Sequence, residues 1–449
     1  MVPGKKFYDS LPVWAQTLAV NAASARNFRG KYGRGFPEAM ARLESNERKS
    51  RDQSLAEQQT ALRELLEYAR RHVPHYRDLD APPDDLAAWP VLDKKIINAA
   101  PHRFLSDEFT AHNVRTVHTS GTTGTPLTVW FTGHCHHMEM AFRWRHRAWG
   151  GVPTLSSGAY IGGHPVVPAG QQRPPFWRLD RVEKRLLFSS YHLAPQHLPQ
   201  YIDALEEYAP VFLHGYPSSV YVLAQYILEA GGLAGWRPSA VFTASETLLD
   251  FQRTAIEQAF GAKVFNWYGN SEMTCNIVEC ACGQLHQRTD YGVLELLEDG
   301  TMLCTGLNNR AMPLIRYRVG DRATARAGAC ACGCGFPLIE RVEGRIEDYV
   351  RTPDGRFVGR LDHLFKDVLH VREAQIVQEQ IDEIILRVVR ADGYADRDEQ
   401  TILAEARQRL GNGVRVRFDY VEALPRTAGG KVRFIVSQLP REQLEFRRP

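Results

Sequence analysis

The sequence lacks any long apolar run. No stretch approaches the roughly 18 uninterrupted apolar residues that a membrane-spanning helix needs. Residues 7–20 contain Asp9, Pro12 and Gln16, which makes them a poor core for a secretory signal. The sequence therefore predicts a cytoplasmic protein without a transmembrane segment. A weak amphipathic helix over residues 11–23, lying on a membrane surface, is the alternative for this segment.

The sequence also lacks an excess of either charge. Lysine and arginine number 55 against 52 acidic residues, a net charge of +3, and the two signs are interspersed. A dedicated nucleic-acid surface would need a strong basic bias, so no nucleic-acid partner is expected. Internal repeats and low-complexity segments are absent as well, and nothing in the sequence predicts an oligomeric state.

Cysteine is too sparse for a disulfide scaffold, with eight residues in 449. Six of them nevertheless fall between residues 280 and 334, and five of these six lie in two segments with the pattern C-x-C-G, the first followed closely by a histidine. This spacing is typical of a structural zinc site with four thiolate or imidazole ligands. We choose Cys280, His286, Cys330 and Cys332 as ligands, with Cys282 and Cys334 as alternates. Reduced cysteines without a metal are the other interpretation.

A loop rich in glycine and hydroxyl groups lies between the short β-branched run 114–117 and the apolar segment 127–131. Its backbone N–H groups and hydroxyls suit an oligophosphate, although an ordinary hairpin turn is the alternative. It is not a Walker loop, because no lysine follows its last glycine, so the cation must come from elsewhere. The residues predicted to contact phosphate are Thr119, Ser120, Gly121, Thr122, Thr123 and Gly124.

At 449 residues the chain is too long for one compact core. Short apolar runs at 158–161, 209–213 and 240–244 alternate with helical patterns at 198–208 and 219–229. This alternation predicts an α/β fold with a mixed, mostly parallel sheet, whose chemistry lies beyond the carboxyl ends of the strands.

The composition changes after Arg345. Strand patterns within 368–386 and 414–420 surround a helical pattern at 398–410. We therefore predict a large domain over residues 1–345, with a zinc-knuckle insertion near 275–335, and a small mobile α+β domain over 346–449.

Several motifs follow the glycine-rich loop in a fixed order. They are Tyr268-Gly269-Asn270-Ser271-Glu272, Arg318-Val319-Gly320-Asp321, Gly344-Arg345-Ile346-Glu347-Asp348 and Gly429-Gly430-Lys431. This set resembles the adenylate-forming superfamily of acyl-CoA synthetases and adenylation domains, from about residue 55 to residue 440. Segments 174–178, 188–192 and 213–219 are similar to the phenylacetate-CoA ligase branch, in particular to members associated with capsular polysaccharide clusters.

The resemblance implies a division of tasks around ATP. Glu272 would coordinate Mg²⁺, Tyr268 would pack on adenine, Asp321 would accept hydrogen bonds from the ribose, and Arg345 would reach the nucleotide. Nucleotide contacts are also implied for Gly269, Asn270 and Ser271, and through the backbone for Ser245 and Glu246.

The resemblance further implies that Lys431 is the missing cation. This lysine would enter the site for adenylation and leave when the small domain rotates about a hinge at Glu347 and Asp348. The carboxylate substrate would lie near His214, Gly215 and Tyr216.

The expected reaction is activation of a carboxylic acid by ATP to an acyl-adenylate with release of pyrophosphate. Transfer of the acyl group to coenzyme A then follows by analogy with the phenylacetate branch. Two alternatives stay open: an amide ligase that joins the acid to an amine, such as an amino sugar or amino acid, and a non-catalytic scaffold that binds adenylate. The identity of the acid does not follow from the sequence.

Overall fold

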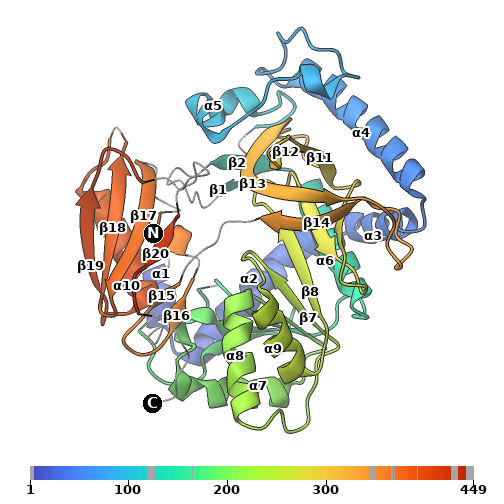
Figure 1. The fold of residues 1–449 in the computed structure, drawn as a ribbon. Coiled ribbons are helices and arrows are strands. Elements are labelled where there is room, and N and C mark those ends of the chain that lie inside the picture. The colour runs from blue at the N-terminus through green and yellow to red at the C-terminus, as the bar shows by residue number, and fades with distance from the viewer. Residues whose placement is uncertain are drawn as a thin grey trace.

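The computed structural model describes residues 5–110, 112–118, 127–163, 165–168, 170–343, 349–359, 361–365, 368, 370–391, 393–425 and 433–440. The predicted α/β class is confirmed. A 12-stranded sheet runs through the large domain in the order β11-β12-β13-β14-β10-β9-β8-β7-β6-β3-β5-β4, and a separate 4-stranded sheet forms the small domain (Figure 1).

Within the 12-stranded sheet, parallel pairing is confined to the strands that alternate with helices. These strands are β5 (Arg185–Ser189), β3 (Gly158–Gly162), β6 (Phe212–Gly215), β7 (Ala240–Ala244) and β8 (Val264–Gly269), with β4 (Trp177–Asp180) antiparallel at the edge. Their buried side chains alternate between two cores, so that Phe212 packs on one face and Leu213 on the other. The helices α7 (Leu198–Tyr208), α8 (Pro217–Glu229) and α9 (Asp250–Phe260) cover one face, and α3 (Gly35–Asn46) and α6 (Gly133–Trp149) cover the other.

The other half of the sheet is antiparallel, so the expectation of mostly parallel pairing holds only where helices connect the strands. Its strands are β9 (Asn276–Glu279), β10 (Leu285–Gln287), β14 (Leu338–Glu343), β13 (Tyr317–Arg326), β12 (Thr301–Gly306) and β11 (Gly292–Leu296). Side chains from this half share a core with α4 (Arg51–His72), α5 (Lys94–Ala99) and the hairpin β1 (Arg115–His118) and β2 (Thr128–Phe131). Two strands therefore flank the predicted phosphate loop, whose residues 119–126 lie outside the described part of the chain.

The carboxyl-terminal module has the expected α+β composition. It contains β15 (Val350–Arg351), β16 (Phe357–Val358), β17 (Val371–Gln380), β18 (Glu383–Arg390), α10 (Asp396–Leu410), β19 (Arg415–Tyr420) and β20 (Ile435–Ser437). Its own core joins the sheet to α10 through Ile402, Ala406 and Leu410. The predicted boundary at residue 345 falls outside the described residues, so its position stays a prediction.

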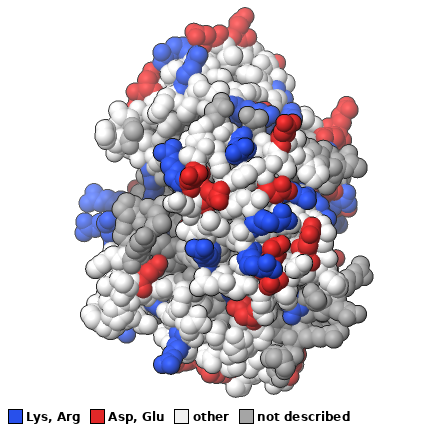
Figure 2. Space-filling model, turned by 90° about the vertical axis from the view of Figure 1, so that its left-hand side faces the viewer, with Lys and Arg blue, Asp and Glu red and all other residues white. Residues whose placement is uncertain are grey.

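Residues 5–46 form three helices. They are α1 (Lys5–Ser10), α2 (Val13–Tyr32) and α3, and α4 follows with a capping box in which Ser50 and Gln53 satisfy each other's backbone N–H. In the described part of the chain, no helix has both the length and the apolar character needed to cross a bilayer. Figure 2 shows one face of the molecule, on which basic and acidic side chains are intermixed.

Three residues with a strained backbone conformation lie beside predicted site motifs, after β7, after β8 and before β13. Six residues other than glycine have positive φ in the described part of the chain, and three of them adjoin predicted site motifs. Ser245 (φ 74°) follows β7, Met273 (φ 54°) follows Glu272, and Arg316 (φ 50°) precedes Tyr317. Such conformations cost free energy and tend to persist at functional sites.

Ser245 offers a direct measure of this strain. We expect Ser245→Gly to be more stable than Ser245→Ala by about 1 kcal/mol, since only the alanine keeps a Cβ that disfavours the left-handed conformation. Both variants lose the hydroxyl, so each serves as the control for the other. Thermal unfolding should give a midpoint roughly 1–3 °C higher for the glycine variant. Equal midpoints would show that the conformation at residue 245 is not strained.

Candidate functional site

A cleft of ≈ 730 Å³ opens at the carboxyl ends of β7 and β8. Segments that are far apart in the sequence line it, namely the end of β7, the end of β8 with the loop after it, and the start of β13. The predicted nucleotide residues in the lining are Ser245, Glu246, Tyr268, Gly269, Asn270, Ser271, Glu272 and Asp321. The fold therefore brings together in one cavity motifs that the sequence shows only as separate strings.

Glu272 is buried at the inner end of this loop, with only 7% of its surface exposed. Its Oε1 accepts a hydrogen bond from the Tyr317 hydroxyl at 2.9 Å, and Lys94 Nζ lies 4.0 Å from the same oxygen. A buried carboxylate that faces a cation and accepts from a hydroxyl donor is fixed in orientation. Glu272 is thus presented to the cleft as an oriented anionic oxygen donor.

Lys94 is a cleft residue that the sequence analysis missed. It reaches the site because Leu92 pairs with Tyr317: Leu92 N donates to Arg316 O at 3.1 Å, and Arg318 N donates to Leu92 O at 2.9 Å. The Asp93 carboxylate then caps α5 by accepting from Ile96 N at 2.9 Å. Only the capping aspartate is visible in the local sequence, and it does not indicate that a lysine beside it approaches residue 272.

Tyr268 and Asp321 face each other across the cleft. The Tyr268 hydroxyl donates to Asp321 Oδ2 at 2.8 Å. Burial, reinforced by the Asp321 charge, holds the pKa of Tyr268 well above its usual value, so the phenol stays neutral and remains a donor. Tyr268 therefore orients the carboxylate that is predicted to bind ribose, in addition to presenting an aromatic ring to the cleft.

The residues between Tyr268 and Glu272 shape the loop. Asn270 Oδ1 accepts from Thr274 N at 2.9 Å, and Asn270 Nδ2 donates to Thr274 Oγ1 at 2.6 Å, which closes the turn that carries Glu272. A Cβ on Gly269 would lie 2.9 Å from Trp267 Nε1, so a glycine is required by close approach. Both residues support the loop, whatever further contact they make with a ligand.

Glu246 lies where the two domains meet. Its Oε2 accepts from Ser218 N, in the first turn of α8, at 3.1 Å. A Cβ on Gly359 would come within 3.0 Å of Glu246 Oε1, which brings the small domain to the rim of the cleft. The predicted nucleotide contact of Glu246 stays a prediction.

The small domain also contacts the large domain through Tyr191. Arg356, in the turn between β15 and β16, donates to the Tyr191 carbonyl and to the carbonyls of Arg409 and Leu410. Arg409 donates to the Tyr191 hydroxyl. Two buried arginines of the small domain thus hold one tyrosine of the large domain.

The predicted substrate residues lie on the adjacent strand. His214 is in β6, with its ring 5.5 Å from the Tyr160 ring, and Tyr216 immediately precedes α8. A Cβ on Gly215 would lie 2.7 Å from Ile161 O, so packing explains this glycine. Among the described residues, none of the three lines the 730 Å³ cleft, and their substrate role stays a prediction.

Four further predicted site residues and the predicted phosphate loop lie outside the described part of the chain. They are Arg345, Glu347, Asp348 and Lys431, together with Thr119, Ser120, Gly121, Thr122, Thr123 and Gly124. Their nucleotide, hinge and catalytic roles stay predictions.

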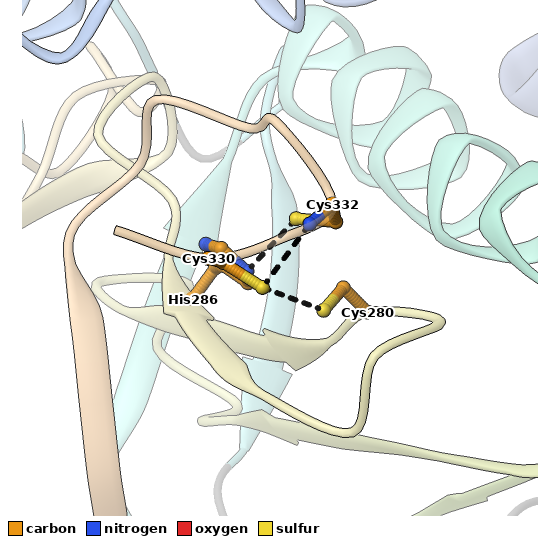
Figure 3. Close-up of side chains that lie close together, drawn as sticks. All are labelled: Cys280, His286, Cys330 and Cys332. Atoms are coloured by element: carbon orange, nitrogen blue, oxygen red, sulfur yellow. Dashed lines mark hydrogen bonds between the residues drawn. The ribbon is translucent and has the colours of Figure 1, made fainter. Parts of the chain in front are cut away.

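The two cysteine segments meet beside β10 and β14, as Figure 3 shows. Ligand atoms of Cys280, His286, Cys330 and Cys332 all lie within 4.8 Å of one another. Cys280 Sγ is 3.6 Å from Cys330 Sγ, and Cys332 Sγ is 3.5 Å from His286 Nε2. A tetrahedral zinc ion with ordinary bond lengths has S–S edges of about 3.8 Å and S–N edges of about 3.5 Å. The cluster thus has the dimensions of a zinc site.

The histidine is oriented for ligation. His286 Nδ1 is 3.2 Å from the Phe336 carbonyl oxygen, so it carries the proton and leaves Nε2 directed at the thiols. Burial lowers the pKa of His286, which favours the neutral, ligating form. The alternates Cys282 and Cys334 fall outside the four-residue cluster that the described residues form. Cys282 lines the cleft. Burial raises the pKa of the Cys334 thiol, and the nearby Arg288 charge partly offsets that rise.

Comparisons with known proteins found similarities in sequence and in fold. A family profile described as the CapK C-terminal domain matches residues 350–438. Protein CapK of Staphylococcus aureus is 29% identical over 340 residues, which cover 72% of this chain and 74% of CapK.

Two solved structures of a 2-hydroxyisobutyryl-CoA ligase share the fold. One, in the postadenylation state with an acyl-AMP, is 18% identical, covers 88% of this chain and 91% of the other, and has a TM-score of 0.52. The second, with 2-HIB-AMP and coenzyme A in the thioesterification state, is 19% identical, covers 87% and 91%, and has a TM-score of 0.54. The chain is thus similar to CapK in sequence, matches the CapK C-terminal domain over residues 350–438, and shares the fold of these two ligase structures.

Proposed function

We propose that the protein is an AMP-forming carboxylate ligase that activates a small carboxylic acid with ATP and passes the acyl group to coenzyme A. The observation that carries this proposal is the assembly of Glu272, Lys94, Tyr268 and Asp321 in one cleft. An anionic oxygen, an adjacent cation, and an aromatic ring joined to a second carboxylate are the groups that a magnesium nucleotide requires. A scaffold without catalysis has no need for this combination.

The residues fit the cofactors that the proposal requires. Magnesium is usually held by one or two carboxylates together with phosphate oxygens, and Glu272 supplies one oriented carboxylate in the cleft. Bound magnesium would neutralise charge on the phosphates. Asp321 would hold the ribose hydroxyls, and Tyr268 would keep that carboxylate in position through its hydrogen bond.

Lys94 extends the proposal beyond the sequence motifs. Its ammonium group lies 4.0 Å from the Glu272 carboxylate and both residues line the cleft, where a polyphosphate would meet both the metal and this cation. Lysine suits the task because its charge is compact and its stem is flexible. Lys94 would therefore bind phosphate in every arrangement of the two domains. Lys431, which belongs to the predicted small domain, would lie in the cleft only in the arrangement for adenylation.

Coenzyme A is the acceptor to test first, because a ligase of the same fold is described in complex with an acyl-AMP and coenzyme A. The amide-ligase alternative uses the same adenylate and differs only in the nucleophile. The relation to CapK makes amino sugars of capsular polysaccharide suitable amines for that comparison.

The decisive experiment measures pyrophosphate release with ATP, magnesium and a panel of carboxylic acids, with coenzyme A, with an amine mixture including amino sugars, or with neither. We expect acid-dependent release that coenzyme A stimulates. Stimulation of pyrophosphate release by amines alone would make the protein an amide ligase. No pyrophosphate release with any acid of the panel would favour the non-catalytic scaffold. Glu272→Gln should lower the rate by about 100-fold, the scale for loss of one charge-stabilising group, whereas Glu340→Gln, in the same cleft but exposed, should not.

Lys94 and its neighbour form a matched pair on α5. Lys94→Met should raise KM for MgATP roughly tenfold, since one charge-assisted phosphate contact is lost. Lys95→Met removes the same charge from an exposed side chain one residue further on and should leave KM within about twofold. Identical kinetics for the two variants would remove Lys94 from the proposed site.

We also propose a structural zinc ion at Cys280, His286, Cys330 and Cys332. Four protein ligands leave no open coordination position, so this ion would stabilise the antiparallel half of the sheet and take no part in the chemistry. It would join two loops about 50 residues apart, beside the strand pair β10 and β14.

Metal analysis of the purified protein tests this proposal directly. We expect about one zinc per chain, with strong loss in Cys280→Ser and Cys332→Ser and a lowered unfolding midpoint in both. Cys282→Ser and Cys334→Ser are the controls and should retain zinc. Substoichiometric zinc in the native protein, or loss in the control variants alone, would contradict the assignment.

A further inference from the structure

Helix α2 has its polarity reversed relative to an ordinary surface helix. Its buried residues are Gln16 and Ser24, which are only 2% and 6% exposed. Gln16 Oε1 accepts from Arg178 Nε at 3.0 Å, and Gln16 Nε2 donates to Leu11 O at 2.9 Å. A surface helix usually turns its apolar side chains inward and its polar ones outward.

Hydrogen bonds attach this helix to the edge strand β4. Ser24 donates to the Asp180 carboxylate, and Asn21 Nδ2 donates to Leu179 O at 2.8 Å. Asn21 Oδ1 in turn accepts from Arg181 N at 2.8 Å. Polar contacts hold the first part of α2 to β4, while Phe28 and Tyr32 pack at its carboxyl end, so the apolar side chains at the start of the helix are not needed for docking.

Those apolar side chains point to solvent. Phe7, Trp14 and Leu18 are 70%, 68% and 61% exposed, the highest values for large hydrophobic residues in the described part of the chain. Trp14 and Leu18 are four residues apart and share a face of α2. The exposed Ala22 and Ala25 continue that face without adding bulk.

The surroundings of this apolar face are basic. From Lys5 to Pro37 the only acidic residue is Asp9, in α1. Arg26, Arg29 and Arg34 are exposed, and none forms an ion pair with any residue that the structure describes. Lys31, by contrast, binds Glu183 at 2.6 Å and is partly buried.

We propose that α1 and α2 form a docking face for an anionic phospholipid surface. Phe7, Trp14 and Leu18 enter the boundary between headgroups and acyl chains, where tryptophan is favoured, and Arg26, Arg29 and Arg34 bind lipid phosphates. A second copy of the chain fits this face poorly, because stacking two such faces would bring like charges together. The proposal concerns where the enzyme works and is independent of its reaction.

Vesicle flotation of the full chain tests the proposal. Vesicles of phosphatidylcholine with about 30% phosphatidylglycerol should carry the protein, pure phosphatidylcholine should carry far less, and added salt should weaken binding. Trp14→Gln/Leu18→Gln and Arg26→Glu/Arg29→Glu should each weaken the apparent Kd roughly tenfold or more.

Matched controls alter the same residue types elsewhere. Leu228→Gln/Phe251→Gln changes exposed apolar residues of α8 and α9, and Arg48→Glu/Arg63→Glu changes exposed arginines near α3 and α4; both should bind like the native chain. No binding to anionic vesicles, or equal loss in the controls, would overturn the proposal. A dimer in sedimentation that Trp14→Gln/Leu18→Gln dissociates would also overturn it, by assigning the face to a second copy.

Discussion

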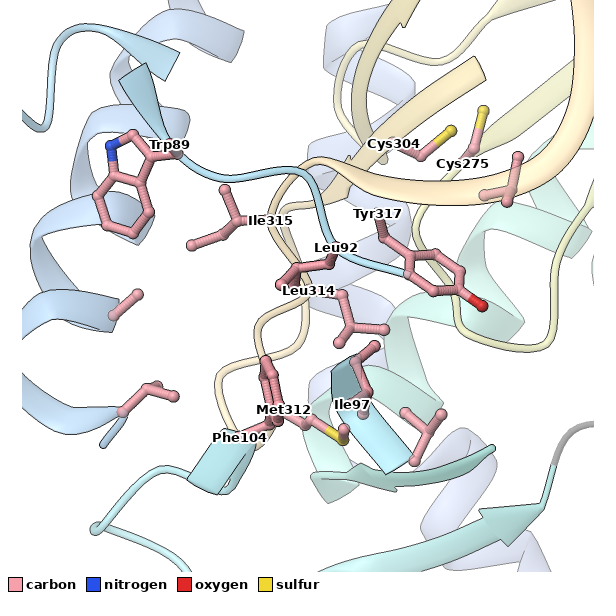
Figure 4. Packing of buried hydrophobic residues seen from close by; sticks show 14 of the residues in the cluster. Trp89, Leu92, Ile97, Phe104, Cys275, Cys304, Met312, Leu314, Ile315 and Tyr317 are labelled. Atoms are coloured by element: carbon pink, nitrogen blue, oxygen red, sulfur yellow. The ribbon is translucent and has the colours of Figure 1, made fainter. Parts of the chain in front are cut away.

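The site depends on one crossing of the chain, where Arg316 and Tyr317 join segments that are distant in sequence. Arg316 donates to the carbonyls of Ala87 and Trp89 at 2.8 Å, and Tyr317 contacts Leu92 through the strand bridge and Glu272 through its hydroxyl. Figure 4 shows the apolar side of this crossing, with Tyr317, Leu92, Trp89 and Ile315 in a common core. Without it, the loop carrying Glu272 and the helix carrying Lys94 would have no fixed relation.

The positive φ of Arg316 is understandable in this setting. Its guanidinium is anchored by two carbonyls and by Glu295, at 3.1 Å from Nε to each carboxylate oxygen, so several hydrogen bonds offset the cost of the conformation. The strain directs the backbone so that Leu92 can pair on one side and the Tyr317 hydroxyl can reach the cleft on the other. The backbone strain at Arg316 and the arrangement of side chains at Glu272 therefore have the same origin.

The sequence predicted features that depend on neighbouring residues and missed those that depend on tertiary contacts. Alternating strand and helix patterns gave β7 and α7 at their observed bounds, because local periodicity determines them. The cluster of Cys280, His286, Cys330 and Cys332 was predictable since the spacing of these residues is distinctive, and the zinc ion itself stays a prediction. Lys94 was not, because a remote strand bridge places it, and the inward polar face of α2 was hidden because hydrogen bonds to β4 decide its orientation.

The contact between Tyr191 and the small domain has a consequence for cooperativity. The small domain has a hydrophobic core of its own, whereas the contacts that Arg356 and Arg409 make with Tyr191 are hydrogen bonds. Water can replace such bonds at little net cost, unlike buried apolar area. The two domains should therefore be able to lose their mutual contact while each stays folded. Denaturant should then unfold them as two partly independent units rather than in one all-or-none step.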